Sequence, residues 1–246
     1  MRGPLHAVEK EEETMSVAAL NLRNGLLRSD VERAQRTRRA AWQRRTLQAP
    51  RVLIIPGLYG SGSAHWQTWL QAQYADAVRV EQEHWNVADL DRWASRIQST
   101  IDAAPAGRWI AVAHSFGCLA LARYLHGRDA AVAAALLVAP ADPRKFGVVH
   151  QLPLQPLGMR STLIGSESDP WMRLESASAW ALLWAARFVN LGAVGHINTE
   201  SGFGPFPAAK GLVDQMLGAT AVDAAMPPNT SVPVALQRAP EFRFAV

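Results

Sequence analysis

The residues best suited to chemistry are Ala113-His114-Ser115-Phe116-Gly117, which follow the apolar run 109–112. Small residues two positions before and after a serine let a strand turn sharply into a helix, and such a turn exposes the hydroxyl as a nucleophile. The pentapeptide alone is a weak signal, because small-x-Ser-x-small is common and a serine at a helix start is often only an N-cap. A catalytic reading therefore requires a base and an acid elsewhere in the chain.

Both partners follow later apolar runs. Asp169 lies in Ser166–Pro170 after the run 162–165, and His196 ends the glycine-containing segment 192–196 after the run 187–191. The order Ser, Asp, His is that of α/β-hydrolases. His196 would accept the proton of Ser115 and return it to the leaving group, and Asp169 would orient the imidazole.

Each assignment has a competitor. Asp169 also precedes Pro170 at a predicted helix start and could simply cap that helix. Asp142 follows an earlier strand and is the rival acid, but Asp169 lies one strand nearer the histidine loop, so we favour Asp169. Cys118, on the helix after the serine, is expected to be a buried apolar residue rather than a catalytic thiol.

An acyl-transfer site also needs donors for an oxyanion. The backbone N–H of Phe116, directly after the serine, is one candidate, and the N–H of Leu58, in the loop after the first apolar run, is the other. The candidate pocket residues are aromatic and histidine side chains in loops or at helix starts: Tyr59, His65, Trp85 and Trp171.

These residues would be positioned by alternating strands and helices. The expected strands are 51–56, 78–81, 109–112, 133–139, 162–165 and 187–191, and the expected helices are 65–74, 89–101, 119–126, 176–186 and 208–217. This alternation predicts an α/β fold with a mainly parallel sheet of about six strands, flanked by helices and without a cap domain. In such sheets, sites form at the carboxyl ends of the strands, where all the candidates fall.

Composition separates a central domain from two flanking segments. Residues 1–51 hold 11 of the 25 Lys and Arg but 6 of the 21 Asp and Glu, so the positive net charge arises there. We expect residues 1–50 to be a basic, partly helical or disordered extension. A nucleic-acid-binding arm and a translation start at Met15 are less favoured alternatives. Residues 51–218 would form the hydrolase-like domain, and 219–246 a Pro-rich flexible tail.

The whole-chain composition points to a cytoplasmic protein. The chain has 246 residues and one cysteine, with no long apolar run and no secretory signal pattern. No His/Cys/Asp cluster has metal-ligand spacing, so we expect neither metal nor cofactor. The oligomeric state is left open.

Several short motifs together resemble one known family. They are Pro56-Gly57 with His65-Trp66, the serine turn with Cys118, Val138–Pro143, Ser168–Pro170, and Gly195–Asn198 with Ser201–Pro205. Over residues 51–218 the chain resembles the small, lidless α/β-hydrolases related to retinoblastoma-binding protein nine. The resemblance implies esterase or amidase activity and a triad at Ser115, Asp169 and His196. Ala113, where many hydrolases have Gly, and Ala88, where a nearby Pro would be expected, depart from the pattern without removing a catalytic group.

The sequence therefore predicts a serine hydrolase that cleaves a small ester or amide through an acyl-enzyme, with no membrane partner. Two alternatives remain open: a non-enzymatic binding protein on a hydrolase scaffold, and an acyltransferase that uses the same triad.

Overall fold

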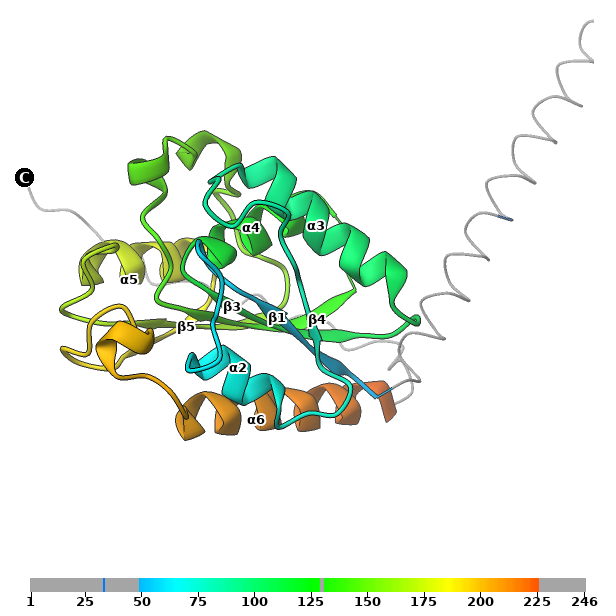
Figure 1. Ribbon diagram of the computed structural model, residues 1–246. Helices are drawn as coiled ribbons and strands as arrows, with labels where there is room; N and C mark the ends of the chain where they lie inside the picture. Colours follow the sequence, from blue (N-terminus) through cyan, green and yellow to red (C-terminus); the bar gives the residue numbers. More distant parts are fainter. Residues whose placement is uncertain (1–32, 34–48, 129–130, 226–246) are drawn as a thin grey trace, which may run out of the picture.

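The computed structural model describes residue 33 and residues 49–128 and 131–225 (Figure 1). The predictions for the basic extension and for the tail beyond 225 therefore lie outside the described residues. None of the described helices is both long and apolar enough to cross a membrane.

The centre of the molecule is a sheet of six parallel strands. In spatial order the sheet is β2-β1-β3-β4-β5-β6, and every neighbouring pair runs parallel. The strands are β1 Arg51–Ile55, β2 Val78–Arg79, β3 Trp109–His114, β4 Val132–Val138, β5 Arg160–Gly165 and β6 Arg187–Asn190. The predicted parallel sheet is confirmed.

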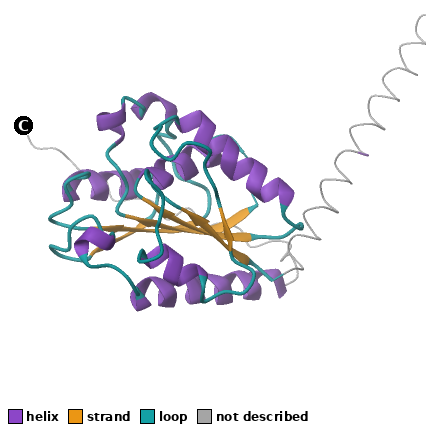
Figure 2. Ribbon diagram, viewed as in Figure 1, coloured by secondary structure: helices purple, strands orange, loops and turns teal. Residues whose placement is uncertain are grey.

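Helices cover both faces of this sheet (Figures 1 and 2). One face carries α2 (Trp66–Gln71) and α6 (Pro207–Ala225), and the other carries α3 (Leu90–Ala103), α4 (Phe116–Leu125) and α5 (Leu174–Leu183). Between β4 and β5 the chain forms two short 3₁₀ helices, η1 (Pro143–Phe146) and η2 (Val149–Gln151); η3 spans Thr199–Ser201. The described segments contain no inserted cap domain.

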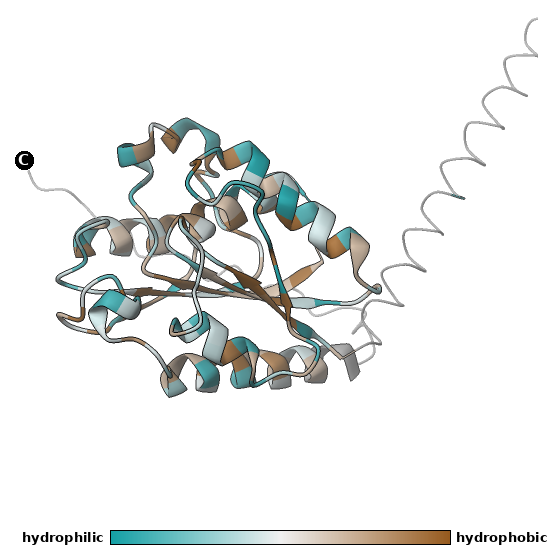
Figure 3. Ribbon diagram, viewed as in Figure 1, coloured by the Kyte–Doolittle hydropathy of each residue, from teal (hydrophilic) through white to brown (hydrophobic). Residues whose placement is uncertain are grey.

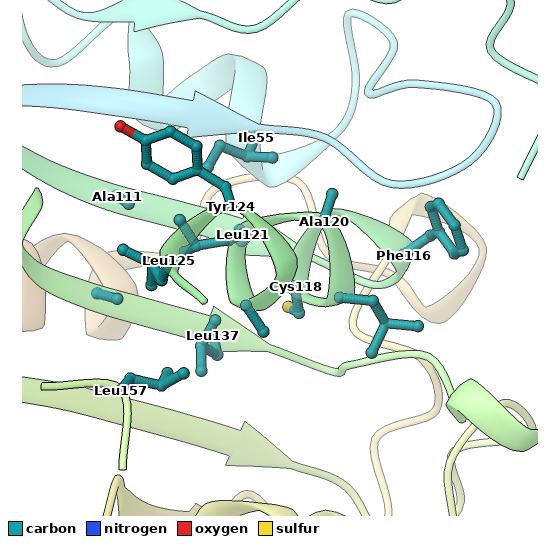
Figure 4. Packing of buried hydrophobic residues seen from close by; sticks show 14 of the residues in the cluster. Ile55, Ala111, Phe116, Cys118, Ala120, Leu121, Tyr124, Leu125, Leu137 and Leu157 are labelled. Atoms are coloured by element: carbon teal, nitrogen blue, oxygen red, sulfur yellow. The ribbon is translucent and has the colours of Figure 1, made fainter. Parts of the chain in front are cut away.

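The central strands β1, β3 and β4 are mostly apolar because both of their faces are buried. Leu53 and Ile55 of β1 pack into the core under α3, α4 and α5, whereas Val52 and Ile54 pack into the core under α2 and α6. The sheet is accordingly the most hydrophobic part of the ribbon (Figure 3). Figure 4 shows the first core, which contains Cys118 and Leu121 of α4 together with Ile55 of β1 and Leu137 of β4. The expectation that Cys118 is a buried apolar residue is met.

Helix α6 differs most from the sequence expectation. It continues to Ala225, seven residues past the predicted domain boundary at 218. The segment after Gly218 is rich in alanine, the strongest helix former, and Pro227 and Pro228 come only later in the sequence. The predicted helix 208–217 is therefore too short at its C-terminal end.

Candidate active site

Ser115 lies in a strained turn between β3 and α4. Its backbone has φ 53° and ψ −125°, a conformation that a residue with a side chain rarely adopts and that typically costs about 1–3 kcal/mol. The turn is packed closely against the loop after β1. A Cβ on Gly117 would lie only 2.4 Å from the carbonyl oxygen of Pro56. A Cβ on Gly57 would likewise meet the Cβ of Ser115 at 2.7 Å. The two glycines let the turn and the loop after β1 approach each other.

The structure brings the three predicted catalytic side chains into one hydrogen-bonded chain. Nε2 of His196 lies 2.9 Å from Oγ of Ser115, and Nδ1 lies 2.9 Å from each carboxylate oxygen of Asp169. The side chains of His196 and Asp169 are 8 % and 2 % exposed. With the proton on Nδ1 directed at the carboxylate, Nε2 is free to accept the serine proton.

Asp169 also caps the turn that follows it, because its Oδ1 accepts the N–H of Trp171 at 2.8 Å. The capping role that competed with the acid role in the sequence therefore coexists with it. The rival Asp142 instead caps η1 through the N–H of Arg144.

Serine hydroxyls hold the loop that carries His196. The backbone N–H groups of residues 194–196 donate, in order, to the hydroxyls of Ser166, Ser168 and Ser201 at 2.9–3.0 Å. The hydroxyl of Ser201 in turn donates to Oδ1 of Asn198. The loop of Asp169 and the loop of His196 (the base loop) are therefore joined by these hydrogen bonds as well as by the contact between the two side chains.

Backbone strain continues on the C-terminal side of His196. Ile197 has φ 50°, which is a clear outlier for a β-branched residue, and its side chain is fully buried against α2 and α6. Packing of this side chain therefore fixes the direction in which the imidazole leaves the loop.

The two predicted oxyanion donors are the backbone N–H groups of Phe116 and Leu58. Phe116 is the first residue of α4, so its N–H has no partner within the helix. Leu58 occupies a tight turn closed by the N–H of Gly60 on the carbonyl of Gly57, and among the described residues no acceptor engages its N–H. The next N–H, of Tyr59, is taken by the carbonyl of Trp85. The loop thus leaves one donor for a ligand, the one predicted from the sequence.

A cavity of about 360 Å³ opens above Ser115. Tyr59 and Trp171 form its exposed rim, at 79 % and 44 % exposure. Its full lining is Leu58, Tyr59, Gly60, Gly62, His65, His114, Ser115, Phe146, Trp171, His196, Asn198, Thr199 and Glu200.

Trp85 does not line this cavity, contrary to expectation. Its ring packs against Gly60 and edge-on against Trp93. The ring therefore supports the loop that carries Leu58 (the oxyanion loop). A larger depression of about 610 Å³ lies at the amino end of β3, around Trp109 and Tyr124, far from the serine and without a nucleophile–base pair in its lining. The smaller cavity is therefore the candidate active site.

Three imidazoles that line the cavity pack against one another, edge-on or tilted. The rings of His65 and His114, and those of His114 and His196, have centroids 5.0 Å apart. Burial lowers the pKa of His65 to about 4, and burial together with the neighbouring imidazoles holds the pKa of His114 well below its usual range. Nε2 of the neutral His114 donates to the backbone carbonyl of His196 at 3.0 Å, which adds a further restraint on the base loop.

Sequence reasoning missed three contributors to the site. Phe146 reaches the cavity from the β4–β5 connection, which carries no recognisable signal. Gln67 is fully buried and bridges two strands beneath the site. Ser201 was visible only as part of the Ser201–Pro205 motif. Within the described part of the chain, no group of three His, Cys, Asp or Glu residues is arranged to hold a metal ion.

Known proteins are similar to this chain in sequence and fold. A model of the serine hydrolase family matches residues 52–215. The crystal structure of a YdeN-like hydrolase from Pectobacterium atrosepticum is 31% identical, with a TM-score of 0.67; the match covers 71% of this chain and 94% of that chain. The ydeN gene product of B. subtilis is 21% identical, with a TM-score of 0.57 and coverage of 69% and 99%. Est1E from Butyrivibrio proteoclasticus is 13% identical, with a TM-score of 0.53 and coverage of 70% and 89%. No curated protein sequence matches the chain.

The two more distant structures show the fold alone, whereas the family model spans more than half of the chain. The predicted α/β-hydrolase fold without a cap and the resemblance to the small hydrolases of this group are both confirmed. The chain belongs to the serine hydrolase family.

Proposed function

We propose that this protein hydrolyses a small carboxylic ester or amide through an acyl-enzyme on Ser115. The observation that carries the proposal is the unbroken chain of 2.9 Å contacts from Ser115 through His196 to Asp169, at the mouth of a cavity. A binding protein would have no use for an imidazole held by a carboxylate on one side and poised at a hydroxyl on the other.

The steps follow from this geometry. His196 accepts the proton of Ser115 as Oγ attacks the carbonyl carbon, and the N–H groups of Leu58 and Phe116 donate to the oxyanion. His196 then protonates the leaving alcohol or amine. A water molecule, deprotonated by His196, attacks the acyl-enzyme and releases the carboxylic acid. Asp169 holds the imidazole in the required tautomer throughout.

The shape of the site favours compact substrates. The cavity of about 360 Å³ is walled by Phe146 and Trp171, and the described segments place no cap above it. Such an open, shallow site suits small acyl groups better than long lipid chains. No metal or cofactor is required by any step.

A fluorophosphonate probe tests the nucleophile. The wild-type protein should be labelled and should turn over p-nitrophenyl acetate, and Ser115→Ala should do neither. Ser99→Ala, an exposed serine on α3, is the matched control and should behave as wild type. Labelling that persists in folded Ser115→Ala would remove Ser115 as the nucleophile.

A second pair of variants tests the acid. Asp169→Asn keeps the shape of the side chain but favours the wrong imidazole tautomer, so kcat should fall by up to about 10⁴-fold. Asp142→Asn should leave kcat within about twofold, because Asp142 only caps η1 with a net effect of about 1 kcal/mol on stability. A reversed order of effects would make Asp142 the acid. Transfer of the acyl group to an added alcohol in preference to water would instead favour an acyltransferase.

A further inference from the structure

His65 is a buried polar group that the catalytic steps do not use. It is 5 % exposed and lines the same cavity as Ser115. Its ring packs at 5.6 Å from that of Trp66 and at 5.0 Å, edge-on, from that of His114. The neighbouring rings therefore hold the imidazole in one orientation.

One nitrogen of this imidazole is committed to the protein. Nδ1 accepts the backbone N–H of Gln67 at 3.1 Å, which caps the start of α2. A nitrogen that accepts a hydrogen bond carries no proton, so the neutral ring has its proton on Nε2. The ring is neutral near pH 7, because burial, with smaller contributions from the charge of Arg79 and from His196, lowers the pKa of His65 to about 4.

The other nitrogen has no partner among the residues that the structure describes. No described residue accepts from Nε2, and this atom is not among the fully enclosed polar atoms, so it reaches the cavity. A donor held nine-tenths buried without a protein acceptor is costly unless a ligand or water occupies it. The cavity thus contains a fixed N–H donor in addition to the two oxyanion donors.

The charges around the cavity limit which substrate group can accept a hydrogen bond from His65. Among the described residues that line the cavity, Glu200 alone has a carboxylate and none is Lys or Arg. A substrate carboxylate or phosphate would be repelled by Glu200. Two nearby cations do not line the cavity and already have partners, because Lys145 donates to the carbonyl of Pro170 and Arg79 donates to Gln71, Ser61 and Thr68. A neutral oxygen is the acceptor that fits a neutral N–H donor in this setting.

We propose that the Nε2–H of His65 binds a neutral oxygen acceptor of the substrate, an ether, hydroxyl or carbonyl oxygen close to the scissile carbonyl. His65 would then be a specificity residue that makes the enzyme select oxygen-bearing esters or amides over hydrocarbon analogues of the same size. This inference rests on the proposed function, because the cavity is the same.

Matched ester pairs test the selection. Methoxyethyl acetate and butyl acetate differ by one oxygen in the leaving group, and p-nitrophenyl methoxyacetate and p-nitrophenyl butyrate differ by one oxygen in the acyl group. The ratio of kcat/KM within each pair is divided by the ratio of the hydroxide-catalysed rates, which removes differences in intrinsic reactivity. We expect the wild-type enzyme to prefer the oxygen-bearing ester by about five- to tenfold in one pair, the value of one neutral hydrogen bond. The pair that responds shows on which side of the scissile bond the acceptor lies.

Two substitutions separate substrate binding from the structural role of the cap. His65→Asn places an amide oxygen near the position of Nδ1, so it keeps the cap and removes the distal donor. His65→Gln places an amide N–H near the position of Nε2, so it keeps the donor and removes the cap. The preference should vanish in His65→Asn and persist in His65→Gln.

The inference is overturned if the wild-type enzyme shows no preference in either pair, or if the preference survives in His65→Asn. Equal loss of kcat/KM for both members of each pair in His65→Asn would also overturn it, since that outcome assigns His65 a structural role only. Absence of fluorophosphonate labelling and of turnover with all four esters is a different result. It would refute the proposed function itself.

Discussion

Gln67 joins the two strands that carry the active site, and its replacement offers a demanding test of the structure. The side chain is fully buried. Its Nε2 donates to the carbonyls of Ile55, at the end of β1, and of Val112, in β3, both at 3.1 Å, and its Oε1 accepts from the hydroxyl of Ser61 at 2.7 Å. One amide therefore satisfies two strands and the oxyanion loop.

Gln67→Met keeps the length and volume of the side chain but removes all three hydrogen bonds. A buried polar group that is left without a hydrogen-bond partner lowers the stability of the folded state by about 1–3 kcal/mol. Two carbonyls that each lose one donor should lower the free energy of unfolding by about 2–5 kcal/mol, and the Tm by roughly 5–15 °C for a domain of this size. We also expect kcat to fall more than tenfold with a smaller change in KM, because the strands would no longer hold Leu58 and Ser115 in register.

Urea unfolding followed by tryptophan fluorescence measures the stability, and p-nitrophenyl acetate turnover measures the rate. Gln73→Met is the control, since Gln73 is exposed just after α2 and bonds only to the carbonyl of Trp69; its effect should stay within about 0.5 kcal/mol. If Gln67→Met changes the free energy of unfolding by no more than this control does and keeps the wild-type kcat, the bridging role is refuted.

Three further predictions concern the turn, the base loop and pH. Gly117→Ala should destabilise the fold by about 1–3 kcal/mol in urea unfolding and abolish most turnover, because its Cβ would meet backbone carbonyls, whereas Gly211→Ala on α6 has open space and should be neutral or stabilising. Ser201→Ala removes an acceptor from the N–H of His196 and should lower kcat about five- to tenfold at nearly constant KM; wild-type kcat would contradict this. His65 stays uncharged in the folded state between its ordinary pKa and about 4, whereas the unfolded chain takes up the proton there. This group should therefore contribute a decline of about 3 kcal/mol in the free energy of unfolding as pH falls from 6.5 to about 4, in addition to any contribution from His114. Unfolding at a series of pH values should show a shallower decline in His65→Asn, and an equal decline would refute the assignment.

The proximity of Ser115, Asp169 and His196 could be predicted from the sequence because each follows an apolar run. Ser115 comes directly after β3, Asp169 and His196 lie in the loops that follow β5 and β6, and parallel strands bring their carboxyl ends to one edge of the sheet. The assignment needed only strand positions and chain order. It did not require knowledge of any side-chain direction.

The remaining contributors depend on side-chain directions, which chain order does not give. Phe146 reaches the cavity from an irregular connection, and Trp85 turns under the oxyanion loop although its neighbours in the sequence suggested a pocket residue. Gln67 looks like an ordinary polar residue of a short helix until β1 and β3 are placed beside it. Gly218 does not end α6, because the alanine-rich segment that follows it continues the helix to Ala225.

The strained backbone at Ser115 sets activity against robustness in this protein. Glycine adopts the φ of 53° and ψ of −125° without a Cβ penalty. A variant with glycine at position 115 should therefore be more stable and should have no nucleophile. A laboratory selection for thermal tolerance alone would therefore be expected to discard Ser115 early. Any evolutionary search for stable versions of this scaffold must score turnover alongside folding, or it will return a well-folded protein without chemistry.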